Sequence, residues 1–223
     1  ASAAGFTDTT STAVDCLKMF GITQGTTATT YSPDDAVTRW QMALYLTRAA
    51  GPAGITLGTG ADQGFTDIPG KSTEIQTAIN QIKQLGITTG KTATTFAPDD
   101  NVTREEMAMF IERWLENVIA GPGGQSDADG LGTTAATTTY VTSDCAGATA
   151  CTGKYNYTDI DAGSVTVEGA NAIKELYDMG IHDGVSATTF NPSDDMTRAA
   201  MATFMTAALA HTNARPAGLT IQA

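Results

Sequence analysis

Apolar residues recur at helical spacing in six stretches of this chain. Three of the stretches each end at a glycine, which is favoured just after a helix because it adopts a positive φ without steric cost. The glycines are Gly21, Gly86 and Gly180. The apolar positions before them are Ala13, Val14, Leu17 and Phe20; Ile75, Ala78, Ile79, Ile82 and Leu85; and Ala172, Ile173, Leu176 and Met179. The pattern predicts three helices that each end at a glycine.

The other three stretches each begin at a threonine that is typical of a helix N-cap. Thr38 and Thr103 are each followed three residues later by Gln or Glu, the capping-box pattern, whereas Thr197 is followed by Ala200. The apolar positions after them are Met42, Tyr45, Leu46 and Ala49; Met107, Phe110, Ile111 and Trp114; and Met201, Phe204, Met205 and Ala208. We interpret these Met-rich and aromatic stripes as core packing.

All six stretches belong to one pattern that occurs three times. Each copy leads at fixed length from a Gly-Ile turn through an aromatic-x-Pro segment to a Thr-Arg pair, over 21–39, 86–104 and 180–198. An aromatic-Thr-Asp triplet precedes each copy, at 6–8, 65–67 and 157–159. Because loops normally tolerate length changes, a loop of constant length indicates a shape that must be kept. Each unit is therefore expected to be a triplet, a helix, a shaped loop and a second helix.

One helix pair is too small to bury its own apolar face, so the three units should pack together. We expect a mainly α fold, in which three helix-loop-helix hairpins form a pseudo-threefold, three-pronged bundle. The expected division is repeat 1 (1–50), a linker (51–64), repeat 2 (65–120), a Gly/Thr/Ala-rich insert (121–156), repeat 3 (157–211) and a C-terminal tail (212–223).

The acidic composition narrows the classes of partner. The formal net charge of −12 argues against nucleic acid and against a basic membrane-surface mode. No apolar run approaches the roughly 20 residues of a membrane helix, so no membrane insertion is expected. With two histidines and no CxxC, the sequence predicts no metal site and no cofactor. Asp127 and Asp129 match only part of a calcium loop.

Threonine-rich loops and the cysteines point weakly to an oxidising, extracellular setting. Cys145 and Cys151 lie close together in the insert, and a local disulfide between them is expected. For Cys16 three states stay open: a free thiol, a bond to the insert, or a bond to another chain.

An arginine opens each of the three second helices, where acidic residues are normally favoured. These residues are Arg39, Arg104 and Arg198. Guanidinium donors beside free backbone N–H groups would make a site for a carboxylate or phosphate. Alternatively, each arginine is paired internally with the aspartate four residues before it, Asp35, Asp100 or Asp194. Both interpretations stay open at this stage.

The complete pattern resembles the S-layer homology repeat. The residues that carry the resemblance are the aromatic-Thr-Asp openings, the Gly-Ile-x-x-Gly turns, the aromatic-x-Pro segments and the Thr-Arg helix starts. The family signature Ile-Thr-Arg-Ala-Glu appears here as Val-Thr-Arg-Trp-Gln (37–41), Val-Thr-Arg-Glu-Glu (102–106) and Met-Thr-Arg-Ala-Ala (196–200).

The resemblance implies a pseudotrimer that binds a cell-wall polymer in grooves between its prongs. It makes Arg39, Arg104 and Arg198 the candidates for meeting an acidic group on the glycan, with the backbone at Gly25, Gly90 and Gly184 lining the same grooves. Trp40, which replaces a usually small residue, is a further candidate for stacking on a sugar.

Two functions compete on this basis. The first is noncovalent anchoring of a cell-surface protein to an anionic cell-wall polysaccharide, outside the cell. The alternative is a self-assembling structural subunit of a surface layer, sheath or filament, which makes a homo-oligomer or polymer a second expected partner. We do not expect an enzyme, because His182 and Asp183 have no nucleophile at a suitable spacing, and we expect His182 to be solvated in its loop.

Overall fold

The computed structural model describes residues 4–118, 155–161 and 163–214. Within them the chain forms helices and connecting loops, with isolated β-bridges but no strand. The helices are α1 (Thr12–Met19), α2 (Arg39–Ala53), α3 (Thr73–Gln84), α4 (Arg104–Leu115), α5 (Val167–Asp178) and α6 (Arg198–Ala210). The prediction of a mainly α fold built from three helix-loop-helix repeats is confirmed.

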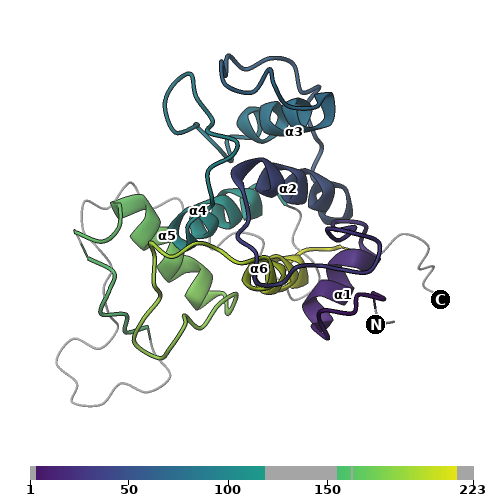
Figure 1. Cartoon of the computed structure of the whole chain (residues 1–223). Helices are drawn as coiled ribbons and strands as arrows, with labels where there is room; N and C mark the ends of the chain where they lie inside the picture. The colour runs from purple at the N-terminus through teal and green to yellow at the C-terminus, as the bar shows by residue number, and fades with distance from the viewer. Residues whose placement is uncertain (1–3, 119–154, 162, 215–223) are drawn as a thin grey trace.

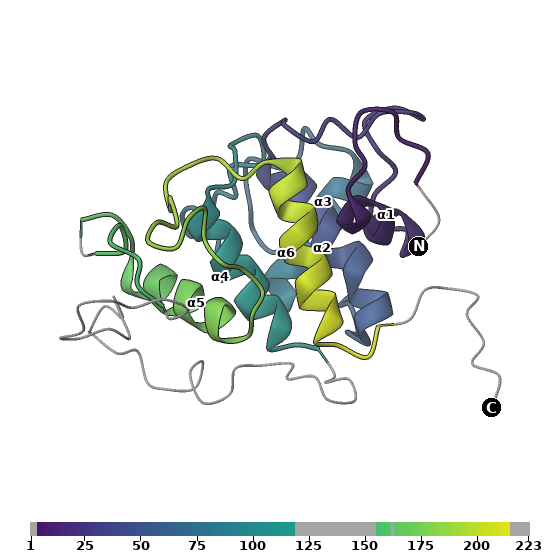
Figure 2. The ribbon, with the colours of Figure 1, turned by 90° about the horizontal axis from the view of Figure 1, so that it is seen from below.

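The three prongs are built from helices of neighbouring units. Helix α2 packs on α3, α4 packs on α5, and α6 packs back on α1, so the pairing is circular. Figure 1 shows α2, α4 and α6 around the centre, with α3, α5 and α1 outside them. The second view shows the three inner helices side by side (Figure 2). The three-pronged bundle agrees with the expectation. We expected each prong to be the hairpin of one unit, however, and instead each prong combines helices of two units.

Three backbone hydrogen bonds close a ring at the pseudo-threefold axis. Val37 N–H donates to the carbonyl of Met196 at 2.9 Å, Met196 N–H to Val102 at 2.8 Å, and Val102 N–H to Val37 at 2.8 Å. All three side chains are fully buried. The residue that precedes each N-cap therefore ties the three units together.

The caps follow the sequence closely. In α4, Glu106 N–H donates to Thr103 Oγ1 at 3.2 Å and Thr103 N–H to Glu106 Oε2 at 3.3 Å, a complete capping box. In α6 the Thr197 hydroxyl accepts from Ala200 N–H at 3.2 Å, so only the cap remains. The apolar stripes of all six helices lie in one core, which includes the fully buried Trp114.

The structure describes only part of the cysteines and acidic residues singled out in the sequence. Cys145, Cys151 and the Asp127–Asp129 segment lie outside the described residues. Cys16 is half-buried on α1, and within the described part of the chain it is a free thiol. None of the described helices has the length and apolar character to cross a membrane.

Candidate functional site

The aspartate of each aromatic-Thr-Asp triplet fixes the shaped loop of its own unit. Asp67 accepts from Phe96 N–H at 2.9 Å and from Ala97 N–H at 2.7 Å, and Asp8 and Asp159 do the same in their units. The residue that follows the aromatic has a positive φ of 56–57° in all three loops. The carboxylate therefore stabilises a turn that its sequence alone does not favour.

The carbonyl of the same aromatic residue holds an arginine from the preceding unit. Arg39 Nε donates to Phe96 O at 2.8 Å, and the other two pairs, Arg104 with Phe190 and Arg198 with Tyr31, are both at 2.7 Å. Each guanidinium also lies 4.5–4.7 Å from the ring of that aromatic. The arginines are only 3%, 7% and 4% exposed, and each of them joins two neighbouring units.

The expected free N–H groups at the helix starts are not free. Arg39 N–H donates to Asp100 O at 2.9 Å and Trp40 N–H to Pro98 O at 3.0 Å, and the other two helices repeat this arrangement. The backbone part of the predicted anion site is therefore wrong. The alternative of an ion pair with the upstream aspartate is not seen either, because the described ion pairs of these three arginines include only Arg39 with Glu106.

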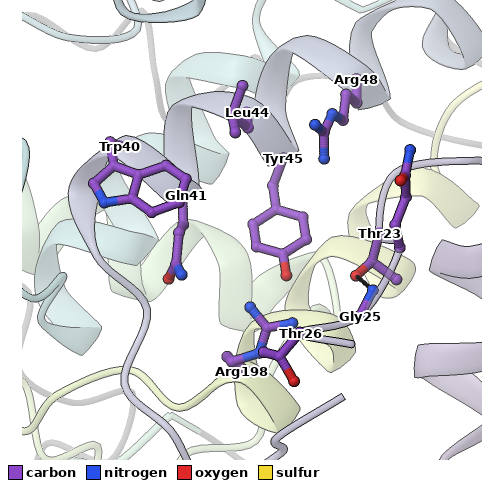
Figure 3. Close-up of a pocket in the computed structure, with 10 residues that line it drawn as sticks. Thr23, Gly25, Thr26, Trp40, Gln41, Leu44, Tyr45, Arg48 and Arg198 are labelled. Carbon is purple, nitrogen blue, oxygen red and sulfur yellow. Dashed lines mark hydrogen bonds between the residues drawn. The ribbon is translucent and has the colours of Figure 1, made fainter. Parts of the chain in front are cut away.

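The first groove lies where unit 3 meets unit 1 and has a volume of about 400 Å³. Its lining residues are Thr23, Gln24, Gly25, Thr26, Trp40, Gln41, Leu44, Tyr45, Arg48 and Arg198. In Figure 3, Trp40 and Gln41 lie on one side and the Thr23–Thr26 loop on the other, with the Tyr45 hydroxyl directed toward Arg198. No carboxylate lines this groove, and Arg198 forms no ion pair with a described residue.

The second groove lies where unit 1 meets units 2 and 3, and it is smaller, at about 170 Å³. It contains Arg39 and Gly90, but also two carboxylates, of Glu106 and Glu168. Glu106 Oε1 lies 3.3 Å from Arg39 and 2.6 Å from Lys91 Nζ, and Glu168 pairs with Arg113. The cations of this groove are therefore already paired.

The third equivalent position, where unit 2 meets unit 3, lacks the polar side chains of the first groove. The side chains that match Gln41 and Arg48 are those of Ala200 and Ala207. His182, which matches Thr23, is 6% exposed, and its ring is parallel to that of Phe204 at 5.5 Å between centroids. We expected a solvated histidine, and this was wrong, because rings from several elements enclose it. Arg104 and Gly184 belong to this position.

His182 performs the backbone role of the threonine that it replaces. Its Nε2–H donates to Ile173 O at 2.9 Å, which leaves Nδ1 to accept from Gly184 N–H at 3.2 Å. Thr23 accepts from Gly25 N–H in the same way, at 3.2 Å. Burial lowers the pKa of His182 to about 4, so the ring is neutral near pH 7.

Glycine is required at the loop position that lines the grooves. Gly25 has a φ of +86°, and a Cβ there would lie 2.5 Å from Phe6 Cε1 and from Thr30 O. Gly90 and Gly184 meet the same restriction from Phe65 and Tyr157. These glycines keep the loop close to its triplet, and Gly25 and Gly90 present only backbone to their grooves.

Sequence reasoning missed one cation of the first groove. Arg48 lines it from α2, where Nη2 lies 2.8 Å from Glu74 Oε1 and Nη1 lies 3.5 Å from Ile22 O. Arg113 forms the equivalent pair with Glu168. Both arginines stand nine residues after the helix-opening arginine, so alignment of the repeats contains the signal.

Comparison with known proteins agrees with this architecture. The model of the S-layer homology domain matches three segments, 6–43, 64–108 and 157–202. The chain is also 31% identical over 183 residues to an endoglucanase of Bacillus sp. (strain KSM-635). That match covers 78% of this chain and 15% of the endoglucanase. The chain therefore belongs to the S-layer homology family, whose domains are non-catalytic modules that anchor proteins to the cell wall at the cell surface.

Proposed function

We propose that this chain attaches to the cell wall by binding an acidic sugar of a wall polysaccharide in the first groove. Arg198 supplies the charge for the carboxylate, Arg48 adds a second cation, and the Thr23–Thr26 loop surrounds the sugar. The observation that carries the proposal is the absence of any carboxylate among the residues that line this groove.

An arginine without an acidic partner is a strong site for an anion. The Arg198 Nε is used by the Tyr31 carbonyl, whereas the remaining guanidinium nitrogens have no described ion pair and the group lines the groove. Because the side chain is almost completely buried, a carboxylate bound there would be only weakly screened by water.

The size and the apolar surfaces of the first groove also suit a sugar. A volume of about 400 Å³ is within the ordinary range for small-molecule sites. Trp40 and Leu44 are half-buried and present apolar surface to the groove, while Gln41 and Thr26 offer polar atoms. We assign Trp40 as the surface on which the sugar ring stacks.

The three arginine positions are proposed to differ in affinity. The second groove, with Arg39, Gly90 and Arg113, is smaller and its helix-opening arginine is paired with Glu106, so we assign it a weaker role. The third position, with Arg104 and Gly184, lacks the Gln41 and Arg48 equivalents and is assigned no glycan.

A matched pair of variants tests the assignment. Arg198→Lys and Arg104→Lys each remove an Nε hydrogen bond to an aromatic carbonyl and keep the charge, so their structural costs should be similar. We expect Arg198→Lys to lower retention on purified Bacillus sp. (strain KSM-635) cell walls by about tenfold, because the planar fork is lost. Arg104→Lys should leave retention close to wild type.

Two further substitutions leave the buried helix-opening arginines and their bonds to the aromatic carbonyls intact. Trp40→Ala and Arg48→Ala should both weaken retention, whereas the matched changes Glu105→Ala and Arg113→Ala should have smaller effects. Equal losses for both members of these pairs, or retention on walls stripped of their secondary polymer, would refute binding in the first groove.

In the endoglucanase, the segment similar to this chain is a small part of a much longer protein. Because the match spans 15% of the endoglucanase, an attached catalytic activity is not assigned to this chain. The division into three repeats, linker, insert and tail is kept as proposed, with α2 continuing to Ala53. Self-assembly stays a prediction, and particle size at high protein concentration tests it.

A further inference from the structure

A second hollow of about 310 Å³ adjoins the first groove on the α2/α3 prong. We call it the prong pocket, and its lining includes Leu44, Thr47, Arg48, Leu57, Thr77 and Gln81, together with the Glu74 carboxylate that is paired with Arg48. Leu44 and Arg48 line both the first groove and the prong pocket. The two hollows are therefore adjacent on α2, with these two side chains between them.

We propose that the prong pocket holds the sugar next to the acidic one, so that the polysaccharide runs from the first groove along the α2/α3 prong. This inference rests on the proposed function, because it requires an acidic sugar in the first groove. The occupant is a neutral, hydroxyl-rich sugar of the same polymer chain.

The lining of the prong pocket suits a neutral sugar. Leu44 and Leu57 are half-buried and offer apolar surface to the face of a sugar ring. The Thr77 and Gln81 side chains are half-buried polar groups on α3. Gln81 Nε2 donates to Gly58 O at 2.8 Å, which holds the linker against α3 and leaves Oε1 to accept from a sugar hydroxyl.

The ion pair between the two hollows does not prevent passage. Arg48 Nη2 and Glu74 Oε1 are 2.8 Å apart, and the Glu74 side chain is 66% exposed. Exposed pairs contribute little to stability, about 0–1 kcal/mol, so Arg48 can turn toward a bound carboxylate at small cost.

The other prong next to a groove is acidic at the same positions. In α4 and α5 the residues that match Thr47 and Gln81 are Glu112 and Glu175. Glu112 interacts with both Glu116 and Glu175. Because this clustering favours the protonated form of Glu112, the charge that would repel an acidic polysaccharide there is that of its carboxylate neighbours. The charge pattern therefore gives the polymer one direction, along α2 and α3.

Fragments of different length separate this inference from the proposed function. The probes are one-sugar and three-sugar acidic fragments of the polysaccharide from Bacillus sp. (strain KSM-635) walls, titrated calorimetrically into the full chain. We expect the three-sugar fragment to bind wild type about tenfold more tightly than the one-sugar fragment.

Thr77→Trp fills the prong pocket, and Asn171→Trp adds the same bulk at the matched position of α5. We expect Thr77→Trp to abolish the length advantage and to leave one-sugar binding unchanged, whereas Asn171→Trp preserves both. Gln81→Glu, which copies Glu175 with little change of shape, replaces the Nε2 donor to Gly58 O by an acceptor and so releases the linker that borders the pocket. This variant should also remove the advantage, and it serves if Thr77→Trp does not fold.

Two results would overturn the prong pocket. One is equal binding of the two fragments by wild type, and the other is an unchanged length advantage in both Thr77→Trp and Gln81→Glu. Failure of the proposed function looks different, since one-sugar binding would then be absent or unaffected by Arg198→Lys.

Discussion

Arg104 Nε donates to the carbonyl oxygen of Phe190 at 2.7 Å, across the boundary between units 2 and 3. The guanidinium lies 4.7 Å from the Phe190 ring and 5.8 Å from that of Phe204. Phe190 N–H is bonded to Asp159, so one loop residue links a triplet, a shaped loop and the helix of another unit. The residues that define the repeat thus join the units to one another.

Arg104→Ala should therefore destabilise the whole bundle. The variant loses a buried charge-assisted hydrogen bond and a cation–π contact, and it leaves the Phe190 carbonyl without this donor. We expect the free energy of unfolding to fall by about 3 kcal/mol. Urea denaturation followed by circular dichroism measures this. Ala199→Ser, a change at a half-buried residue that follows the next helix-opening arginine, is the control, and a loss below about 0.5 kcal/mol in Arg104→Ala would contradict the linking role.

The local elements were predictable from the sequence because their signals are local. Gly21, with a φ of +72°, follows α1, and Thr103 caps α4, as the pattern of each unit indicates. The circular pairing of prongs was not predictable, because no helix carries a signal for which neighbour its apolar face meets. The hydrogen bond from the Trp40 backbone N–H to the Pro98 carbonyl of the next unit was not predictable for the same reason.

The grooves were predicted less well than the fold. The family resemblance placed Gly25 and an arginine in one groove, but it did not indicate that the arginine next to Gly25 is Arg198 of unit 3. The burial of His182 depends on Tyr157 and Phe204, which are remote in sequence. Charge pairing across grooves, as between Glu106 and Arg39, is likewise a tertiary property.

Exchanging the matched residues Gln41 and Glu106 should exchange the glycan affinities of the first and second grooves. Glu106→Gln removes the partner shared by Arg39 and Lys91 and copies Gln41 of the first groove. We expect the variant to bind the one-sugar acidic fragment at an additional site, seen as increased stoichiometry in calorimetry. The released cations are the physical reason.

The reverse change is the matched control for the exchange. Gln41→Glu places a carboxylate in the first groove, and affinity for the same fragment should fall by about tenfold or more, because like charges repel. If Glu106→Gln gains no binding while Gln41→Glu loses none, pairing of the groove cations does not control glycan affinity.

His182 should make the protein sensitive to acid. Its pKa is lowered from an ordinary value of 6.5 to about 4, chiefly by burial, so the unfolded chain takes up a proton first as pH falls. The stability that the neutral ring provides is complete above pH 6.5 and is lost as pH falls toward 4, by on the order of 3 kcal/mol. Denaturation at several pH values measures the loss.

The variant His182→Thr restores the residue found at Thr23 and Thr88. It should be less stable than wild type at pH 7, since the ring contacts are lost, but its stability should change less between pH 6.5 and 4. A parallel pH dependence in wild type and variant would show that another group is responsible.

Glu112 should make the folded protein less stable as pH rises. Its pKa is raised from 4.5 to about 8, first by burial and then by Glu116 and Glu175, while Arg113 opposes the shift. The protonated form is favoured in the folded state, so its contribution is complete below pH 4.5 and is lost as pH rises toward 8. Because Glu112 is only half-buried, the loss should be on the order of 2 kcal/mol.

Glu112→Gln keeps the shape of the neutral side chain and cannot ionise. We expect its free energy of unfolding to match that of wild type near pH 4.5 and to exceed it by on the order of 2 kcal/mol at pH 9. A stability difference between Glu112→Gln and wild type that is constant from pH 4.5 to 9 would show that the pKa of Glu112 is the same in the folded and the unfolded chain. The burial and the neighbouring charges of Glu116 and Glu175, which favour the protonated form of Glu112, would then have no effect on this side chain.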